Sequence, residues 1–213
     1  MEYSLSEIRR EYARHSLSEH EVNANPIHQF KQWLEEAIKS QVPDPGAMVL
    51  STANKGNRVS SRVVLLKDVQ EEGFIFYTNY NSKKAADLKE NAQAGILFYW
   101  PELERQVRVE GNVKVVSSSV SDEYFASRPE KSKIGAWASE QSREIPGRKY
   151  LEEQVEKYKN EFKDREIKRP EYWGGYILKP DIIEFWQGRP NRLHDRIQFS
   201  FEANRWEVRR LAP

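Results

Sequence analysis

The fold is decided by the stretch Ala47-Met48-Val49-Leu50-Ser51-Thr52-Ala53-Asn54-Lys55-Gly56-Asn57-Arg58-Val59-Ser60-Ser61-Arg62-Val63-Val64-Leu65-Leu66-Lys67-Asp68-Val69. Its two arms, residues 47–53 and 59–69, are rich in apolar and β-branched residues, which favour extended strands. Between them lies Asn54-Lys55-Gly56-Asn57, a set of residue types that favours a tight turn. The stretch therefore predicts two antiparallel strands joined as a hairpin.

The same strand pattern recurs along the rest of the chain. It covers residues 74–78, 94–100, 106–116, 175–179, 181–187 and 196–210, the last split by a turn at Ala203-Asn204. Six or more short antiparallel strands interrupted by helices predict an α+β protein, mainly β, built as a small closed barrel with peripheral helices. We expect residues 26–213 to form a single domain and residues 1–25 to form a mobile N-terminal arm.

Four helical patterns lie between the strands. One begins at Pro26 and stops before Pro43, one spans Ser82 to Asn91 with Ser82 as N-cap, one begins at a Ser119–Asp122 capping box and ends at Arg128-Pro129, and one covers about 147–164.

The composition excludes several kinds of function. The chain has 213 residues, 34 basic and 33 acidic side chains and a net charge of +1, which gives no support to a nucleic-acid or membrane-surface role. It has no cysteine, and its four histidines are not spaced as metal ligands. No signal sequence is apparent, so we expect a cytoplasmic protein. A hydrophobic fraction of 38% with 12% aromatics fits a dimer whose interface serves as shared core.

A cation-rich turn follows the apolar run Ile182-Ile183-Glu184-Phe185-Trp186. The segment from Trp186 to Arg196 holds three arginines, one histidine and one aspartate. Such a concentration of cations is costly unless something negative or electron-rich lies against it. The expected ligands are phosphates or a planar ring, because the arginine fork suits both.

Three other segments carry candidate binding groups, and each also has a plain structural explanation. In Arg62–Lys67, alternate residues share a face, and the charges could simply face water from an edge strand. Tyr77–Lys84 combines hydroxyls, lysines and a helix start, which suits an anion but also an ordinary capped helix. Tyr124 and Arg128 are four apart, so that they can converge on one ligand or merely end a helix favourably.

Taken in order, these motifs resemble those of the pyridoxine/pyridoxamine 5′-phosphate oxidase family. The matching motifs are Arg62-Val-Val-Leu-Leu-Lys67, Phe76-Tyr-Thr-Asn79, Glu104-Arg-Gln-Val107, Tyr124-Phe-Ala-Ser-Arg-Pro129, Ile134-Gly-Ala-Trp137, Gln141-Ser142, Trp173-Gly-Gly175, Glu184-Phe-Trp-Gln-Gly188, Arg192-Leu-His-Asp-Arg196 and Arg210-Leu-Ala-Pro213. They extend from about Arg9 to the C-terminus.

The resemblance implies a homodimeric FMN-binding split barrel whose sites are shared between subunits. FMN is expected to contact Arg62, Val63, Val64, Leu65, Leu66, Lys67, Tyr77, Thr78, Lys83, Lys84, Gln106, Gln141, Ser142, Trp186 and Arg196. The substrate phosphate is expected at Lys67, Tyr124, Arg128 and Ser132, and the rest of the substrate at Arg9, Arg10, Glu11, Tyr12, Arg192, Leu193 and His194. Arg192 and His194 are the expected catalytic pair, and no metal is expected.

The implied reaction is oxidation of pyridoxamine or pyridoxine 5′-phosphate to pyridoxal 5′-phosphate. Hydride passes from substrate C4′ to flavin N5, and O₂ is reduced to H₂O₂. Two alternatives remain: a split-barrel flavin reductase that acts on another substrate, and a non-catalytic carrier of FMN or a B6 phosphate. One departure from the family pattern is Lys83, where arginine is usual; lysine keeps the charge but not the fork.

Overall fold

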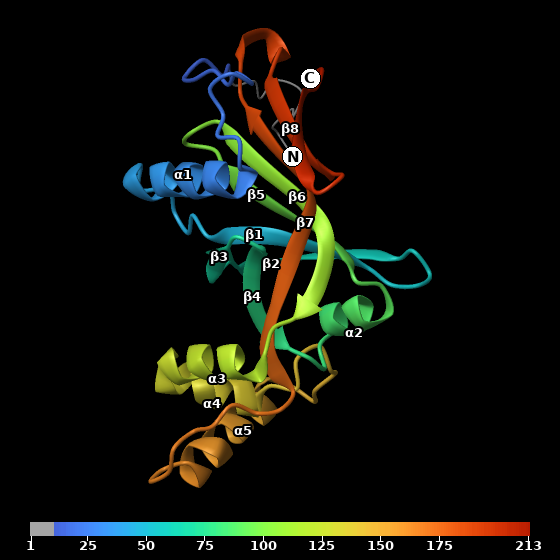
Figure 1. Cartoon of the computed structure of the whole chain (residues 1–213). Helices are drawn as coiled ribbons and strands as arrows, with labels where there is room; N and C mark the ends of the chain where they lie inside the picture. Colours follow the sequence, from blue (N-terminus) through green and yellow to red (C-terminus); the bar gives the residue numbers. More distant parts are fainter. Residues whose placement is uncertain (1–10) are drawn as a thin grey trace, which may run out of the picture. The chain divides into compact units, whose positions relative to one another are not determined.

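The computed structural model describes residues 11–213 (Figure 1). By their internal contacts, these residues divide into two compact units, each assembled from separated segments. Unit 1 comprises residues 11–49, 95–110 and 180–213, and unit 2 comprises residues 50–94 and 111–179. The predictions of one domain over 26–213 and of a mobile arm over 1–25 stay predictions.

The described strands form one sheet in the order β2-β1-β5-β6-β7-β4-β3, and β8 pairs with β7 and β9. The strands are β1 (Ala47–Ala53), β2 (Val59–Leu65), β3 (Asp68–Gln70), β4 (Gly73–Asn79), β5 (Gln93–Trp100), β6 (Arg105–Val115), β7 (Trp173–Gln187), β8 (Asp195–Glu202) and β9 (Arg205–Arg210). The β3–β4, β4–β7, β7–β8 and β8–β9 pairs are antiparallel. The predicted α+β fold with an antiparallel split-barrel sheet is confirmed.

Five α-helices accompany the sheet in the described part: α1 (Pro26–Lys39), α2 (Lys83–Glu90), α3 (Ser118–Ser127), α4 (Glu130–Ala138) and α5 (Arg148–Glu161). The start of α1 follows from its sequence. Asn25 accepts a hydrogen bond from the Ile27 N–H, and Pro26 occupies the first turn, where its missing N–H costs nothing. Helix α1 therefore begins where the sequence predicted.

Each unit has its own aromatic core. In unit 1, the Phe30 ring of α1 lies 4.8 Å from Phe98, and Trp33 meets Phe185 edge to face at 5.2 Å. In unit 2, Phe125 and Trp173 are buried together, and Phe74 and Phe76 of β4 are fully buried. These large side chains bury much apolar area each, which offsets the modest hydrophobic fraction of the chain.

Two strand boundaries differ from the prediction. The arm predicted over 59–69 is wrong as a single strand, because β2 ends at Leu65 and the next strand, β3, pairs with β4. The strands predicted at 175–179 and 181–187 are one continuous strand, β7. Its partner is β4 up to Leu178 and β8 from Ile182, so Pro180, which has no N–H, lies where the partner changes.

Two helix predictions also need correction. Helix α3 begins at Ser118 with Ser117 as N-cap, whose hydroxyl accepts from the Val120 N–H at 3.4 Å, so the Ser119–Asp122 capping box is wrong. Helix α4 was not predicted, and its N-cap residue, Pro129, makes no side-chain cap hydrogen bond. With neither a polar cap nor a long apolar stripe, its sequence carries little helical signal.

Candidate active site

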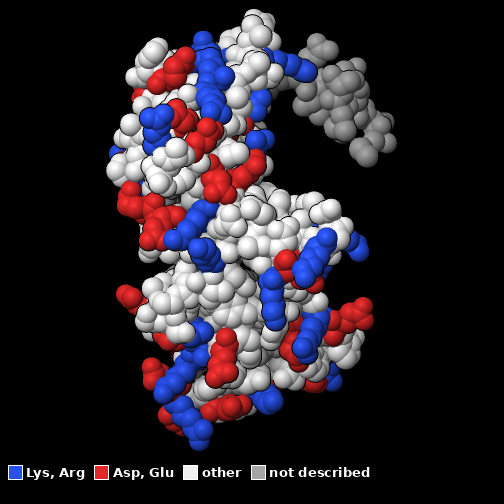
Figure 2. All heavy atoms as spheres, turned by 45° about the vertical axis from the view of Figure 1, so that its right-hand side comes forward, with Lys and Arg blue, Asp and Glu red and all other residues white. Residues whose placement is uncertain are grey.

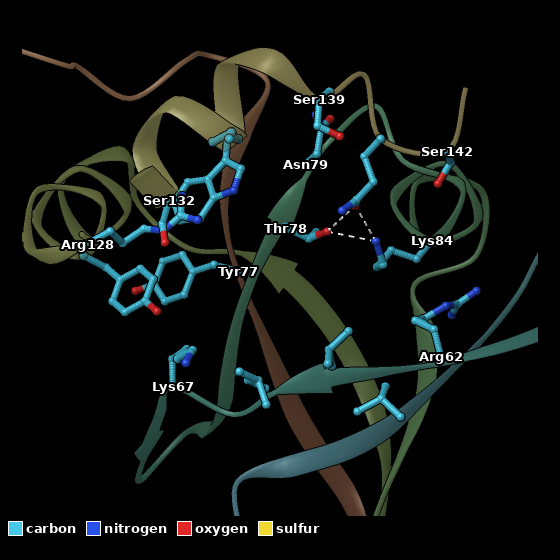
Figure 3. A pocket seen from close by; sticks show the side chains of 18 of the residues that line it. Arg62, Lys67, Tyr77, Thr78, Asn79, Lys84, Arg128, Ser132, Ser139 and Ser142 are labelled. Carbon is cyan, nitrogen blue, oxygen red and sulfur yellow. Dashed lines mark hydrogen bonds between the residues drawn. The ribbon is translucent and has the colours of Figure 1, made fainter. Parts of the chain in front are cut away.

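A pocket of about 700 Å³ opens in unit 2, between side chains of β2, β4, α2, α3, α4 and the segments next to them (Figure 3). It brings together most of the residues that the sequence assigned to phosphate binding. The lining residues are Arg62, Val63, Val64, Leu65, Lys67, Tyr77, Thr78, Asn79, Lys83, Lys84, Tyr124, Arg128, Ser132, Gly135, Ala136, Ser139, Gln141, Ser142 and Trp173.

The charge of this lining is one-sided. Among the described residues that form it are five cations, Arg62, Lys67, Lys83, Lys84 and Arg128, and no carboxylate. Figure 3 shows Arg62 and Lys84 on one side of Thr78, and Lys67 and Arg128 on the other. Five like charges around one cavity repel one another unless anions bind there. The pocket is therefore suited to ligands with more than one anionic group.

Lys84 is a buried cation at the start of α2. Its Nζ donates to Thr78 Oγ1 at 3.0 Å, to Ser82 Oγ at 3.2 Å and to Gln141 Oε1 at 2.7 Å. Burial, together with the charge on Arg62, lowers the pKa of Lys84 to about 8. Gln141 is exposed, so it is the partner that an anionic oxygen can displace at least cost.

Arg62 projects from β2, where alternate residues are half-buried. Its guanidinium donates to the Leu50 carbonyl at 3.1 Å, to Thr52 Oγ1 at 2.8 Å and to Ser60 Oγ at 2.6 Å. Burial lowers the pKa of Arg62, and the charge on Asp87 opposes that shift. Three of its five N–H donors are engaged, which leaves two for a ligand.

A stack of aromatic rings forms one wall of the pocket. The rings of Tyr77 and Tyr124 are nearly parallel with centroids 3.9 Å apart, and Tyr77 lies 5.5 Å from Trp173. Tyr77 faces Gly175 across the β4–β7 pair, and a Cβ at Gly175 would come within 2.7 Å of the Tyr77 ring. The glycine of the Trp173-Gly-Gly175 motif thus makes room for this ring. Burial raises the pKa of Tyr77 to about 12, so its hydroxyl stays a neutral donor.

Arg128 is the cation whose bonding is incomplete. It caps the C-terminus of α3 in an extended conformation, with its guanidinium 4.5 Å from the centroid of the Trp173 ring. Its Nη1 is buried and has no hydrogen-bond partner among the described residues. Burial lowers the pKa of this guanidinium. Since buried donors are almost always paired in native proteins, the bare Nη1 indicates where an anionic oxygen of a ligand binds.

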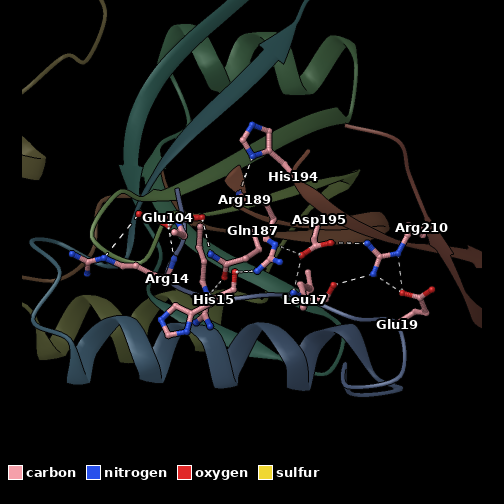
Figure 4. Close-up of polar contacts among 12 residues, drawn as sticks. Arg14, His15, Leu17, Glu19, Glu104, Gln187, Arg189, His194, Asp195 and Arg210 are labelled. Atoms are coloured by element: carbon pink, nitrogen blue, oxygen red, sulfur yellow. Dashed lines mark hydrogen bonds and ion pairs between the residues drawn. The ribbon is translucent and has the colours of Figure 1, made fainter. Parts of the chain in front are cut away.

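The segment Trp186–Arg196 lies in unit 1, where two of its three arginines are paired. Figure 4 shows one of them, Arg189, beside Asp195. Arg189 contacts Asp195 at 3.5 Å and the His15 carbonyl at 3.0 Å. Arg196 makes a two-pronged contact with the buried Glu184 at 3.0 and 2.9 Å. Arg192 makes no hydrogen bond or ion pair within the described part of the chain and has a strained φ of 61°.

His194 is held in one orientation within the same segment. Its Nδ1 accepts the Arg189 N–H at 3.1 Å, and its ring lies 4.6 Å from Trp186 and 5.8 Å from Tyr12. Burial and the charge on Arg192 lower the pKa of His194. The imidazole is therefore neutral near pH 7, with its proton on Nε2 as a donor.

The segment that carries Tyr12 is fastened to unit 1 by Glu104. This buried carboxylate accepts the N–H groups of Ala13 and Arg14 at 3.0 and 3.2 Å (Figure 4). Glu104 has a φ of 56°, unusual for a residue with a side chain. A Cβ at Gly188 would lie 2.7 Å from Tyr12, so the glycine permits this close packing.

The predicted residues are thus distributed over both units. Unit 2 gathers Arg62–Leu65, Lys67, Tyr77, Thr78, Lys83, Lys84, Gln141 and Ser142 with Tyr124, Arg128 and Ser132 in one pocket, and Leu66 is absent from its lining. Unit 1 holds Glu11, Tyr12, Gln106, Trp186, Arg192, Leu193, His194 and Arg196. Arg9 and Arg10 lie outside the described residues. The sequence did not single out Asn79, Gly135, Ala136, Ser139 or Trp173, although the Trp173-Gly-Gly175 motif was a usable signal.

Two further observations limit the kind of site. Among the described residues, no group of three or more histidines, aspartates or glutamates is arranged to hold a metal ion. No described helix has the length and apolar character needed to cross a bilayer. On the face shown in Figure 2, basic and acidic side chains are interspersed, in keeping with the net charge of +1.

The antiparallel sheet and its cation-lined pocket define the class: a protein with the split-barrel flavoprotein fold. A solved structure of PhzG from Burkholderia lata, in complex with tetrahydrophenazine-1-carboxylic acid, superposes with a TM-score of 0.87. It is 30% identical, over 91% of this chain and 95% of that one.

The family follows from the sequence comparisons. The family model described as "Pyridoxamine 5′-phosphate oxidase" matches residues 34–161, and the one described as "Pyridoxine 5′-phosphate oxidase C-terminal dimerisation region" matches residues 173–213. A pyridoxine/pyridoxamine 5′-phosphate oxidase of Cyanothece sp. is 49% identical over 100% of both chains. That of Polynucleobacter asymbioticus is 50% identical over 99% of each. The chain belongs to the pyridoxamine 5′-phosphate oxidase family, as its motifs predicted.

Proposed function

We propose that this protein is an FMN-dependent oxidase that converts pyridoxamine or pyridoxine 5′-phosphate to pyridoxal 5′-phosphate, with O₂ reduced to H₂O₂. The observation that carries the proposal is the pocket of unit 2, with five cations and no carboxylate among its described lining residues. A cofactor and a substrate that each bear a phosphate need two cationic clusters, and the pocket has two. Family membership supports the same reaction.

FMN fits the cluster around Lys84. We assign its phosphate to Arg62, Lys83 and Lys84, and its remaining contacts to Val63–Lys67, Tyr77, Thr78, Gln106, Gln141, Ser142, Trp186 and Arg196. The two unengaged donors of Arg62 and the displaceable Gln141 support the phosphate assignment. When bound, FMN supplies the two-electron chemistry, and the protein supplies binding and orientation.

The substrate phosphate fits the second cluster, formed by Lys67, Tyr124, Arg128 and Ser132. The bare Nη1 of Arg128 supports this assignment, because a phosphate oxygen would complete its bonding. Lys67 makes no hydrogen bond or ion pair through its side chain in the described part of the chain. The stacked Tyr77 and Tyr124 rings add a rigid wall beside the phosphate.

Arg192 and His194 are assigned to the substrate ring, with Leu193, Arg9–Tyr12 and the homodimer's second subunit completing the site. Arg192 has a strained backbone and makes no ion pair with the residues that the structure describes, and it can stabilise charge as hydride leaves the substrate. The Nε2–H of His194 can donate to a ring substituent. The dimerisation match covers both residues, which supports a shared site. A cytoplasmic location is part of the same proposal.

The test is direct. Purified protein is loaded with FMN and mixed in air with pyridoxamine 5′-phosphate, and aldehyde and peroxide are measured together. We expect equal amounts of both products, and far slower turnover of pyridoxamine, which lacks the phosphate that the cationic pocket recognises. Absence of aldehyde and peroxide would rule out the oxidase. Equal rates with and without the phosphate would rule out the second phosphate cluster.

A further inference from the structure

Asp87 is a buried acid that the proposed reaction leaves without a role. It lies on α2, its residue is 2% exposed, and it does not line the pocket. Its Oδ2 accepts the Thr52 hydroxyl at 2.9 Å and the Ser60 hydroxyl at 3.1 Å, and its Oδ1 accepts Lys83 Nζ at 2.5 Å. Burial alone would raise the pKa of Asp87, but the hydrogen bonds from Lys83, Thr52 and Ser60 together lower it, so the group is a carboxylate.

The two hydroxyls link Asp87 to Arg62. A carboxylate only accepts, so Thr52 and Ser60 must point their hydrogens at Asp87 and turn their lone pairs elsewhere. Those lone pairs receive Arg62 Nη1 at 2.8 Å and Nη2 at 2.6 Å. These two hydrogen bonds hold the plane of the Arg62 guanidinium in place, so its two unengaged N–H donors point in one fixed direction.

Lys83 is tied to the same carboxylate directly. It precedes Asp87 by one helical turn, and its side chain is half-exposed while that of Asp87 is buried. An exposed lysine otherwise samples many rotamers, and a ligand that binds it must order it. The ion pair with Asp87 restrains Lys83 at the edge of the pocket before any ligand arrives.

We propose that Asp87 is a positioning residue for the cofactor phosphate: it fixes Arg62 through Thr52 and Ser60, and Lys83 directly. This inference rests on the proposed FMN site and adds a residue to it. A carboxylate near an anion site also repels the anion. The geometry points to positioning as the larger effect, because Asp87 holds one cation directly and another through two hydroxyls, while its own charge is met by the donors of Lys83, Thr52 and Ser60.

The experiment is a flavin titration of apoprotein, followed by quenching of flavin fluorescence. FMN and riboflavin are compared, because riboflavin has the same ring and no phosphate. In Asp87→Asn we expect FMN affinity to fall about tenfold, the change expected from loss of one charge-assisted contact, with riboflavin affinity unchanged. Tighter or unchanged FMN binding would overturn the proposal, and so would equal loss for both flavins.

Two further variants keep the test decisive. Thr52→Val preserves Asp87 and side-chain volume but cuts one link to Arg62, so it should reproduce part of the selective loss and carries the test if Asp87→Asn fails to fold. Glu90→Gln removes an exposed charge from the same helix and should change nothing, since among the described residues this carboxylate accepts only the Lys55 N–H. If the wild-type protein itself fails to prefer FMN over riboflavin, the proposed cofactor site fails as well. If the wild-type protein and Asp87→Asn prefer FMN over riboflavin to the same extent, only the proposed role of Asp87 fails.

Discussion

The paired arginines of unit 1 and the cation-lined pocket of unit 2 are opposite arrangements of charge. In unit 1, Arg105, Arg189, Arg196 and Arg210 each contact a carboxylate: Glu36, Asp195, Glu184, and Asp195 with Glu19, respectively. In unit 2, the pocket lining has five cations and no acid among its described residues. The binding signal is therefore an unengaged donor, such as Arg128 Nη1, and not the number of arginines.

Arg192 is the exception in unit 1, and its removal should have the largest effect. Because Arg192 makes no ion pair within the described part of the chain, Arg192→Ala leaves no described carboxylate without its partner and should keep FMN affinity and stability near normal. If it stabilises charge in the transition state, kcat should fall by about 10²–10³. Steady-state kinetics and flavin titration measure the two effects separately.

Arg189→Ala is the matched control, since this neighbouring arginine is paired with Asp195. We expect it to change kcat much less. Equal losses in the two variants would remove the distinction between paired and unpaired arginines on which the comparison depends.

Arg105→Met tests a paired arginine of unit 1, which we expect to serve stability and not ligand binding. Arg105 is buried, lies 4.3 Å from the centroid of the Trp33 ring, donates to Gln187 at 2.9 Å and pairs with Glu36. Its loss should lower the free energy of unfolding by about 2–3 kcal/mol, less than for a fully buried pair because Glu36 is partly exposed. Urea unfolding at fixed protomer concentration measures this change. A selective loss of FMN affinity instead would mean that a paired cation also serves binding.

Much of the fold could be read from local sequence, and the exceptions have different causes. The hairpin, the start of α1 at Pro26 and the split of the last strands at Ala203-Asn204 follow from residue types within a few positions. Helix α4 was missed because its own sequence lacks a polar cap. The change of partner around Pro180 depends on β4, which lies far from β7 in the sequence. Local pattern does not contain that information.

The candidate site also contains features that local sequence predicted and features that it did not. Tyr124 and Arg128 do reach one pocket, but α3 ends between them, so their four-residue spacing predicted the result for an incomplete reason. Nothing in the local sequence assigned a role to Asp87, because its partners Thr52 and Ser60 are 35 and 27 residues away. The contacts of Gln106, Trp186, Arg196, Arg192 and His194 with flavin or substrate stay predictions.

Arg128→Ala tests whether the buried Nη1 of Arg128, which has no partner among the described residues, binds the substrate phosphate. A charge-assisted phosphate contact contributes about 1.5–3 kcal/mol, so KM for pyridoxamine 5′-phosphate should rise about 10–150-fold, while kcat at saturation and FMN affinity change little. Lys131→Ala, which removes an exposed cation outside the pocket lining, is the control and should leave KM unchanged. An unchanged KM in Arg128→Ala would take this arginine out of the phosphate site.

The smallest effect concerns the protonation of Lys84, whose pKa is lowered from 10.5 to about 8 by burial and the charge on Arg62. Below about pH 8 the ammonium is charged and attracts the FMN phosphate. Above it, the amine is neutral in the free protein, and a bound phosphate favours the protonated form. FMN affinity should therefore fall as pH rises through about 8, by at most about tenfold per pH unit.

Stability of the apoprotein should change in the opposite direction. Unfolded Lys84 regains its ordinary pKa of 10.5, so between about pH 8 and 10.5 the unfolded chain binds more protons than the folded one. Lys84 therefore makes the folded state more stable as pH rises through this window. Lys84→Met, measured by flavin titration and urea unfolding over the same pH range, should flatten both slopes. If the pH dependence of FMN affinity and of stability is the same in Lys84→Met as in the wild-type protein, another group causes it. Lys84 would then resemble the paired arginines of unit 1, which we expect to contribute little to ligand binding.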